Sequence, residues 1–313
     1  MLLAAVAALA VLAPQLLGGE AGVRRARPAA AAPAALPMAG PAVLGSAGTV
    51  PAPLAVRLDD PRDAVDVGLE HPPRAGLLFD LGTGRVLWRH RPARVLPIAS
   101  LTKMMTALLV AERVPHGAGV RITPEALRYR GSGVGLFPRG KRIDVETMLH
   151  GLLLVSGNDA AIALAQRAAG GSVRRFVWLM NQRARAMGLE CTRFSTPSGY
   201  RDAGNHSCAG DLAAMARALL RTRRLARIVR RRSAILRFPT KGGKVYLYNT
   251  NPLLRGRYRG TTGIKTGSTL AAGRCLVATA RRGATRLGVV LLHSPDPGLQ
   301  ARRLLDRGFR AAR

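Results

Sequence analysis

The chain has 313 residues, 48% of them hydrophobic, which is enough for one large domain or two small ones and excludes a wholly disordered protein. Its formal net charge of +32 indicates an anionic neighbour. Only 4% of the residues are aromatic and no nucleic-acid recognition motif is visible, so nucleic acid is not the expected partner.

The chain begins with a nearly continuous run of Ala, Val and Leu over residues 1–17. This run is similar to the apolar part of a secretory signal peptide, although no basic residues precede it. It is short for a membrane span, but an uncleaved anchor is the alternative. We predict a signal peptide or anchor over residues 1–23, and a protein that is extracytoplasmic, in the cell envelope or secreted. Anionic wall polymers or lipid headgroups then fit the positive charge, and a merely solvated basic surface is the alternative.

Residues 24–70 are rich in Ala, Pro and Gly and have no periodic apolar pattern, which predicts a flexible linker. The ordered domain is expected over residues 71–313. It opens with two strands, Ala75–Leu81 and Arg85–Trp88, joined by a glycine-rich turn.

The next feature is Ser100-Leu-Thr-Lys103, followed by an apolar run without Gly or Pro over Met104–Val110. This pattern predicts a helix that begins at Ser100, on which residues three apart are neighbours. A serine becomes a good nucleophile when an adjacent base takes its proton, and Lys103 is then within reach. Alone, the pair fits an ordinary polar helix start equally well. Lysine is rare in this arginine-rich chain, which draws attention to each one: Lys103, Lys141, Lys241, Lys244 and Lys265.

The middle of the chain is predicted to be helical. Helices are expected over Asp144–Leu154 with an Asp144 cap, from Asp159 to Ala168, from a Ser172 cap to Met187, and from Asp211 to about Leu220. The first two are separated by Ser156-Gly157-Asn158.

The end of the chain returns to strands and closes with a helix. The expected strands are Lys244–Tyr248, Gly263–Gly267, Cys275–Ala280 and Thr285–Leu292, and the expected helix is Leu299–Phe309. Strands at both ends with short turns indicate an α+β fold, in which both chain ends contribute to one antiparallel sheet. The central helices would form a second, mostly helical lobe, with a cleft between the two.

Three cysteines leave one unpaired by number in an exported chain. Cys275 lies in an apolar strand-like run, so we expect it to be buried and outside any disulfide. Cys191 and Cys208 flank a turn-rich segment and are the pair for which a disulfide is considered, although the sequence leaves that open.

Three short motifs occur in order: Ser100-x-x-Lys103, Ser156-Gly157-Asn158 and Lys265-Thr266-Gly267. Each is weak alone, but together they match the set found in serine β-lactamases and penicillin-binding proteins. The flanking runs sharpen the match: Ser156-Gly-Asn-Asp-Ala-Ala161, Thr196-Pro-Ser-Gly199, His206-x-x-x-x-Asp211-Leu, Asn249-Thr-Asn251 and Gly263-Ile-Lys-Thr-Gly-x-Thr269. Over residues 71–313 the chain resembles the D-alanyl-D-alanine carboxypeptidases, low-molecular-mass penicillin-binding proteins of the DD-peptidase/β-lactamase superfamily.

The resemblance implies a serine peptidase that removes the terminal D-alanine from peptidoglycan stem peptides and is trapped covalently by β-lactams. Ser100 would attack the carbonyl and Lys103 would take its proton, which requires a neutral amine. Burial beside a second cation, Lys265, would lower the pKa of Lys103 from its reference value of about 10.4. Ser156 would bridge the two lysines and pass the proton to the leaving amine.

The remaining motif residues would bind substrate. The resemblance implies that Asn158 binds the substrate backbone and that Lys265 and Thr266 bind the terminal carboxylate. Gly267 would let the strand approach the substrate closely. The backbone N–H groups of Ser100 and Ser268 would form the oxyanion hole.

Alternatives and departures remain. A β-lactamase would need a glutamate that holds the deacylation water, and the glutamate between the second and third motifs, Glu190, lacks that context. A wall-binding protein with weak or no activity is a non-enzymatic alternative. A Ser198–His206–Asp211 triad is not expected, because no Gly-x-Ser-x-Gly elbow accompanies it. No cofactor and no metal are expected.

The family often carries an arginine before the closing helix that helps to hold the substrate carboxylate, and residues 293–298 contain none. Either Lys265 and Thr266 suffice, or an arginine such as Arg274 substitutes, or turnover is weak. The basic cluster over residues 227–232 is expected to be a solvated face.

Overall fold

The computed structural model describes residues 54–59, 63–200, 204–239 and 242–312. The predicted signal peptide or anchor over residues 1–23 and the first part of the predicted linker lie outside these residues. Within them, no helix is both long enough and apolar enough to span a membrane.

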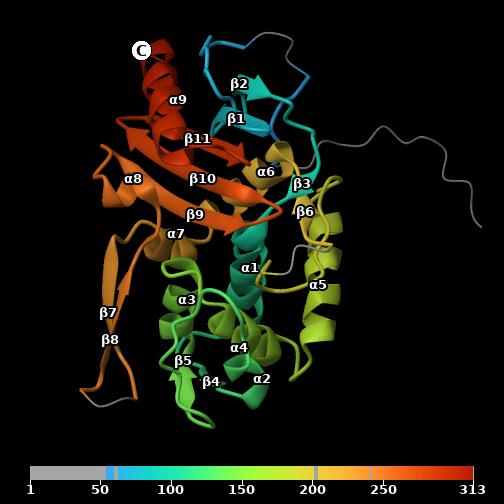
Figure 1. The fold of residues 1–313 in the computed structure, drawn as a ribbon, viewed down its shortest axis with the longest axis vertical. Coiled ribbons are helices and arrows are strands. Elements are labelled where there is room, and N and C mark those ends of the chain that lie inside the picture. Colours follow the sequence, from blue (N-terminus) through green and yellow to red (C-terminus); the bar gives the residue numbers. More distant parts are fainter. Residues whose placement is uncertain (1–53, 60–62, 201–203, 240–241, 313) are drawn as a thin grey trace, which may run out of the picture. The chain divides into compact units, whose positions relative to one another are not determined.

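One five-stranded antiparallel sheet joins the two ends of the described chain, as predicted (Figure 1). Its order is β2-β1-β11-β10-β9, and the early strand β1 pairs with the late strand β11 from Ala75 opposite Leu292. Strand β9 lies at the edge of the sheet. The bounds are β1 Ala75–Asp80, β2 Val86–His90, β9 Thr261–Thr269, β10 Gly273–Arg282 and β11 Thr285–Leu292.

The two faces of the sheet bury different cores because side chains alternate along a strand. Leu276 and Val289 belong to the core under α9 (Pro297–Ala311), and Val277 and Val290 belong to the larger core shared with the helical lobe. Burial of both faces explains why β10 and β11 read as nearly continuous apolar runs rather than as alternating strands.

The central segment forms the predicted helical lobe (Figure 1). Helix α1 lies in its middle, and every residue from Lys103 to Val110 is buried. The Asp144 and Ser172 caps are confirmed, since each side chain accepts backbone N–H bonds from the helix that it opens. The helices are α1 Lys103–Arg113, α2 Pro124–Leu127, α3 Val145–Leu153, α4 Asn158–Ala168, α5 Val173–Ala186, α6 Ala209–Arg221 and α7 Arg223–Val229.

Several short elements were not predicted, because two to five residues carry too little periodicity to be recognised. The predicted strand at residues 244–248 is confirmed, and it forms a hairpin with an unpredicted partner. The small pairs are β3 Leu96–Pro97 with β6 His206–Ser207, β4 Gly119–Arg121 with β5 Arg142–Asp144, and β7 Ser233–Arg237 with β8 Lys244–Tyr248; α8 is Pro252–Arg255.

Packed chain begins before residue 71, where the linker was expected to end. The Val65 N–H donates to Leu87 O at 2.9 Å, and Arg89 pairs with Asp63 at 2.6 Å. Val65 is also buried against the α9 side of the sheet. This part of the predicted linker is therefore part of the folded domain.

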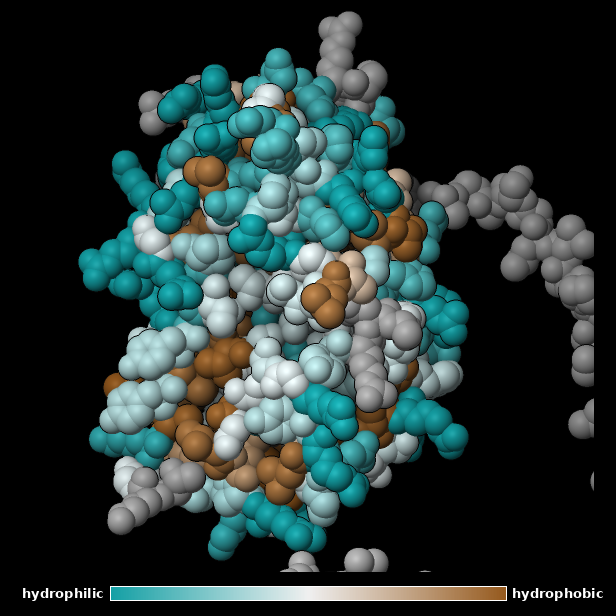
Figure 2. Space-filling model, viewed as in Figure 1, coloured by the Kyte–Doolittle hydropathy of each residue, from teal (hydrophilic) through white to brown (hydrophobic). Residues whose placement is uncertain are grey.

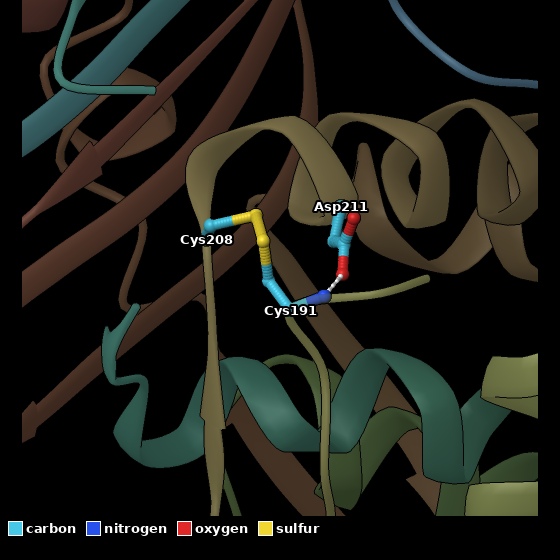
Figure 3. A group of neighbouring side chains, drawn as sticks. All are labelled: Cys191, Cys208 and Asp211. Atoms are coloured by element: carbon cyan, nitrogen blue, oxygen red, sulfur yellow. Dashed lines mark hydrogen bonds between the residues drawn. A yellow bond between two sulfur atoms is a disulfide. The ribbon is translucent and has the colours of Figure 1, made fainter. Parts of the chain in front are cut away.

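Cys191 and Cys208 form a disulfide, with Cα atoms 5.6 Å apart (Figure 3). Asp211 lies beside it and accepts the Cys191 backbone N–H at 2.8 Å. The ligand atoms of these three residues lie within 4.8 Å of one another, but sulfurs joined to each other are not thiolates and do not bind a metal ion in this state. Cys275 is buried outside the disulfide, and its thiol lies 3.4 Å from Ala272 O.

Hydrophilic side chains cover most of the face drawn in Figure 2, and hydrophobic ones gather low on it, beside the β7–β8 hairpin. The hairpin exposes the side chains of Ile235, Tyr246 and Tyr248. It projects from the lobe instead of packing along its whole length.

Candidate active site

Ser100 lies in a 3₁₀ turn, η1 (Ala99–Thr102), and α1 begins at Lys103. The predicted helix therefore starts three residues later than expected, with a tighter turn before it. A 3₁₀ turn has three residues per turn, so Ser100 and Lys103 lie directly above one another. Ala99 has a φ of 47°, a region that only a few per cent of residues other than glycine adopt. The residue before the candidate nucleophile is thus held in a strained conformation.

The Lys103 amine contacts three oxygen atoms. Its Nζ lies 2.9 Å from Ser100 Oγ, 2.7 Å from Asn158 Oδ1 and 2.8 Å from Ser198 O. Two of these, the amide and the carbonyl oxygen, can only accept a hydrogen bond, whereas the Ser100 hydroxyl can also donate one. A neutral amine has two N–H groups and one lone pair. The three contacts therefore suit a neutral Lys103 that accepts the Ser100 proton.

Burial and a neighbouring charge favour the neutral form. Lys103 is 0% exposed and Lys265 is 1% exposed. Burial, and then repulsion from Lys265, hold the pKa of Lys103 well below its ordinary value, while the Asp159 carboxylate opposes them. Burial lowers the pKa of Lys265 to about 7. Both lysines are therefore shifted toward the neutral form, and the neutral form of Lys103 is the one that can act on Ser100.

Ser156 lies between α3 and α4 with its side chain buried and a φ of 63°. Its Oγ makes no hydrogen bond to any residue that the structure describes. The predicted bridge between the two lysines is therefore absent: Lys103 is satisfied by its three oxygen contacts, and Lys265 Nζ donates to Thr266 O at 2.8 Å. The buried Ser156 hydroxyl is left with its donor and acceptor capacity unused.

Asn158 begins α4 and is already engaged. Its Oδ1 receives the Lys103 contact, and its Nδ2 donates to Arg130 O at 2.5 Å. The next residue, Asp159, is buried and accepts the backbone N–H groups of Val134 and Gly135 at 3.0 and 2.9 Å. Burial raises the pKa of Asp159, and these hydrogen bonds oppose the increase. The start of α4 thus fixes both Lys103 and the loop over residues 130–135.

Strand β9 passes beside η1, the turn that carries Ser100 and is called the serine turn below. A Cβ on Gly267 would lie 3.0 Å from Ile98 O and 3.1 Å from Ser100 N, so only glycine permits this approach without a shift. Thr266 Oγ1 lies 2.7 Å from Thr250 Oγ1, and Ser268 is exposed. The structure therefore brings the β9 motif to the Ser100 backbone.

The loop at residues 196–199 packs against the other side of the serine turn and is hydrogen-bonded to α1. The Thr106 hydroxyl donates to Pro197 O at 2.7 Å, and Ser198 O receives the Lys103 contact. Gly199 has a φ of 72°, and a Cβ there would collide with Ala99 O. Beside this loop, a cavity of about 280 Å³ is lined by Asn158 and Tyr200, among others.

Sequence comparison identifies the family. The family model for D-alanyl-D-alanine carboxypeptidase matches residues 64–296. The chain belongs to the D-alanyl-D-alanine carboxypeptidase family. It is 35% identical to the D-alanyl-D-alanine carboxypeptidase DacF of Bacillus subtilis over 249 residues, which are 77% of this chain and 63% of that protein. It is 34% identical to DacB2 of Mycobacterium tuberculosis over 246 residues, 76% of this chain and 82% of the relative.

Solved structures agree with this assignment and confirm the predicted α+β fold. A D-alanyl-D-alanine carboxypeptidase from Mycobacterium tuberculosis superposes with a TM-score of 0.73 and 32% identity, covering 79% of this chain and 94% of the other. A mutant of a Streptomyces DD-transpeptidase superposes with a TM-score of 0.73 and 29% identity, covering 78% and 100%. The chain spans only about three fifths of the length of DacF and of DacC of Escherichia coli.

The structure does not assemble a Ser198–His206–Asp211 triad. The Asp211 carboxylate accepts the Thr192 hydroxyl and the Cys191 N–H at 2.7 and 2.8 Å. Burial raises the pKa of Asp211, and these two bonds oppose the increase. His206 pairs through its backbone with Arg193 and lies in β6.

Sequence reasoning missed three parts of this site: the Ser198 carbonyl, the Asp159 carboxylate and the Thr250 hydroxyl. Each of these residues lies in a run that matches the family, but none belongs to the three short motifs to which reactive roles were assigned. The available signal was glycine: Gly199 and Gly267 mark the two places where backbone contacts the serine turn.

Replacing Gly199 with Ala tests the contact behind the serine turn. We expect Gly199→Ala to slow acylation by penicillin at least about tenfold, because the new Cβ displaces Ala99 and with it Ser100. Gly170→Ala is the matched control, since Gly170 also has a positive φ, 65°, but open space around it. Urea unfolding should show a loss of about 1 kcal/mol in Gly170→Ala from the positive φ alone, and a larger loss in Gly199→Ala because of the added collision. Equal acylation rates in the two variants would contradict the contact's role.

Proposed function

We propose that the chain is a serine-type D-Ala-D-Ala carboxypeptidase that removes the terminal D-alanine from peptidoglycan stem peptides. The observation that carries this proposal is the 2.9 Å contact between Ser100 Oγ and a fully buried Lys103 amine that lies beside a second buried lysine. Because the chain covers about three fifths of DacF, the activity is inferred from the site rather than taken over from that relative.

In the first step, Ser100 Oγ attacks the carbonyl carbon of the peptide bond between the two D-alanines. Its proton moves to the neutral Lys103 amine, and the carbonyl oxygen becomes an oxyanion. The backbone N–H groups of Ser100 and Ser268 stabilise that charge, which is the largest single electrostatic contribution in many acyl transfers. The close approach of Gly267 to Ser100 N supports this pairing of the two N–H donors.

In the second step, the C–N bond breaks and the leaving amine takes a proton. We assign this delivery to Ser156 Oγ, a buried hydroxyl with unused donor and acceptor capacity among the described residues. The relay requires Ser156 Oγ to contact Lys103 Nζ in the substrate complex, because the two make no hydrogen bond here. D-Alanine leaves, and the rest of the peptide remains as an ester on Ser100. Water then hydrolyses the ester and restores the enzyme. A β-lactam would acylate Ser100 in the same way and remain attached.

Substrate binding is assigned to Asn158 and to β9. Asn158 would contact the peptide backbone with the Nδ2 hydrogen that is not donated to Arg130. Lys265 and Thr266 supply a cation and a hydroxyl for the terminal carboxylate. Arg274 lies directly opposite Ser268 on β10, so both side chains project on the same face, and no described residue pairs with its guanidinium. Arg274 therefore supplies the cation that the loop at residues 293–298 lacks.

The location follows from the substrate. Stem peptides of the wall lie outside the cytoplasm, so we assign the chain to the cell envelope or to secretion. The positive charge of +32 would favour a position against the anionic polymers or lipids of that compartment.

Release of D-alanine from a peptide that ends in D-Ala-D-Ala tests the proposed activity. The wild-type chain should release one D-alanine per peptide, and Ser100→Ala should reduce the rate to background because no acyl-enzyme forms. Mass spectrometry after penicillin treatment should show one adduct in the wild type and none in Ser100→Ala. Rapid hydrolysis of penicillin without D-alanine release would instead assign a β-lactamase.

Arg274→Gln tests the carboxylate contact. We expect KM for the same peptide to rise about tenfold or more with little change in kcat, since a charge-assisted hydrogen bond to the ground-state carboxylate is lost. An amidated peptide should show no such difference between the two enzymes. Arg175→Gln removes an exposed arginine from α5, outside both the candidate active site and the sheet, and is the control. An unchanged KM in Arg274→Gln would contradict the Arg274 contact and would mean that Lys265 and Thr266 alone bind the carboxylate.

A further inference from the structure

A second cavity, of about 510 Å³, lies on the helical side of the sheet and away from Ser100. Its lining residues come from the end of α6, from α7, from the turn after β1, and from the ends of β9, β10 and β11 that point away from the candidate site. These elements are labelled in Figure 1. Seven of its thirteen lining residues are arginines and none is acidic. The arginines are Arg217, Arg221, Arg223, Arg227, Arg230, Arg281 and Arg286.

The arrangement of these arginines is ordered. Arg223 and Arg227 of α7 and its C-cap residue Arg230 follow one another at helical spacing of four and three residues, so they lie on one side of that helix. Arg281 and Arg286 are direct partners across β10 and β11. Like charges directly opposite one another on a sheet are destabilising. The fold therefore keeps a repulsive cross-strand pair at the mouth of a cavity that is already positive.

The exposed arginines have few partners of their own. In the described part of the chain, no ion pair or hydrogen bond holds the side chains of Arg221, Arg223, Arg227, Arg230 or Arg286, and Arg281 donates only to Gly283 O. The nearby carboxylate of Asp80 does not line the cavity and accepts the backbone N–H groups of Gly82 and Thr83. The N–H donors of the exposed arginines are therefore available to an anion.

The inner wall is built by a buried guanidinium. Arg217 is 6% exposed and donates to four backbone carbonyls, those of Leu54, Ala55, Leu81 and Gly82, at 2.7–3.2 Å. Burial and the adjacent Arg221 lower the pKa of Arg217. This side chain fixes the wall of the cavity and keeps a permanent positive charge behind the exposed arginines.

We propose that this cavity binds a phosphate-bearing anion, either a phosphodiester of an anionic polymer or the phosphate of a lipid headgroup. Guanidinium groups present two parallel N–H donors that match pairs of phosphate oxygens, and several guanidiniums line this cavity while no carboxylate does. An anion that bridges Arg227 and Arg281 would also relieve the repulsion between β10, β11 and α7. Two of the four arginines that the sequence placed on a solvated face, Arg227 and Arg230, thus belong to a binding site.

The site is separate from the candidate active site. On β9 the cavity contacts Thr262, whereas Lys265 and Ser268 lie three and six residues further along, about 10 and 20 Å away at strand rise. Phosphate binding would hold the domain against its anionic surroundings and leave the Ser100 side of the sheet accessible to stem peptides. This inference does not depend on the catalytic proposal.

Calorimetric titration of the full chain with inorganic tripolyphosphate tests the proposal. The double variant Arg223→Gln/Arg227→Gln should bind at least about tenfold more weakly, because two charge-assisted donors are lost. The matched control Arg174→Gln/Arg175→Gln removes two exposed arginines from α5 and should change the affinity by less than about twofold. Arg217 is left intact because it holds the fold, and thermal melting verifies that both variants are folded. Penicillin acylation should be unchanged in both.

Further arms define the ligand. Sedimentation with phosphatidylglycerol/phosphatidylcholine vesicles, and with phosphatidylcholine alone, shows whether a lipid phosphate is bound through the same pair of arginines. Loss of vesicle binding in the α7 variant alone, with weak binding of tripolyphosphate, assigns the lipid source. Loss of tripolyphosphate binding alone assigns a soluble polymer. An equal loss in the α5 control, equally tight binding of citrate, or no binding of either phosphate probe would overturn the proposal.

Discussion

The Lys103 amine is buried among oxygen atoms beside a second buried lysine, and this juxtaposition controls the chemistry available to Ser100. Two buried ammonium groups so close together would be costly, since burial and mutual repulsion both act against the charged forms. The structure relieves that cost by favouring a neutral Lys103, which is the form that can accept a proton from serine. The same condition that makes the site unfavourable for charge therefore makes it suitable for base catalysis.

The surrounding fold maintains this condition from three directions. Helix α1 carries Lys103 through the core of the helical lobe, α4 supplies the Asn158 oxygen, and the loop at residues 196–199 supplies the Ser198 carbonyl. Edge strand β9 adds a fourth contact, where Gly267 packs against the serine turn. These segments are far apart in sequence, and the sheet built from both chain ends brings β9 against the lobe. The arrangement of the candidate site therefore depends on the topology of the sheet.

The sheet, the main helices and the reactive motifs could be predicted from sequence, because long apolar runs, Asp144 and Ser172 caps, and ordered short motifs are local signals. The contacts among them could not. The predicted Ser156 bridge is absent, and the Asn158 and Ser198 oxygens that contact Lys103 instead come from segments whose sequence spacing does not reveal their distance. The packing of Val65 and the cross-strand partner of Arg286 likewise depend on the assembled sheet. Arginines that look solvated in sequence are brought around one cavity only by that assembly.

Nuclear magnetic resonance of protein labelled with carbon-13 at lysine Cε tests the central claim most directly, because the chain has only five lysines. The signal that disappears in Lys103→Arg should titrate well below the ordinary lysine pKa of about 10.4, so that the amine is neutral once the pH exceeds that lowered value. In Lys265→Gln the midpoint should move to higher pH, because repulsion that lowers the pKa of Lys103 is removed, whereas Lys141→Gln should leave it unchanged. A Lys103 signal that keeps its ammonium shift up to the ordinary lysine pKa would contradict the account.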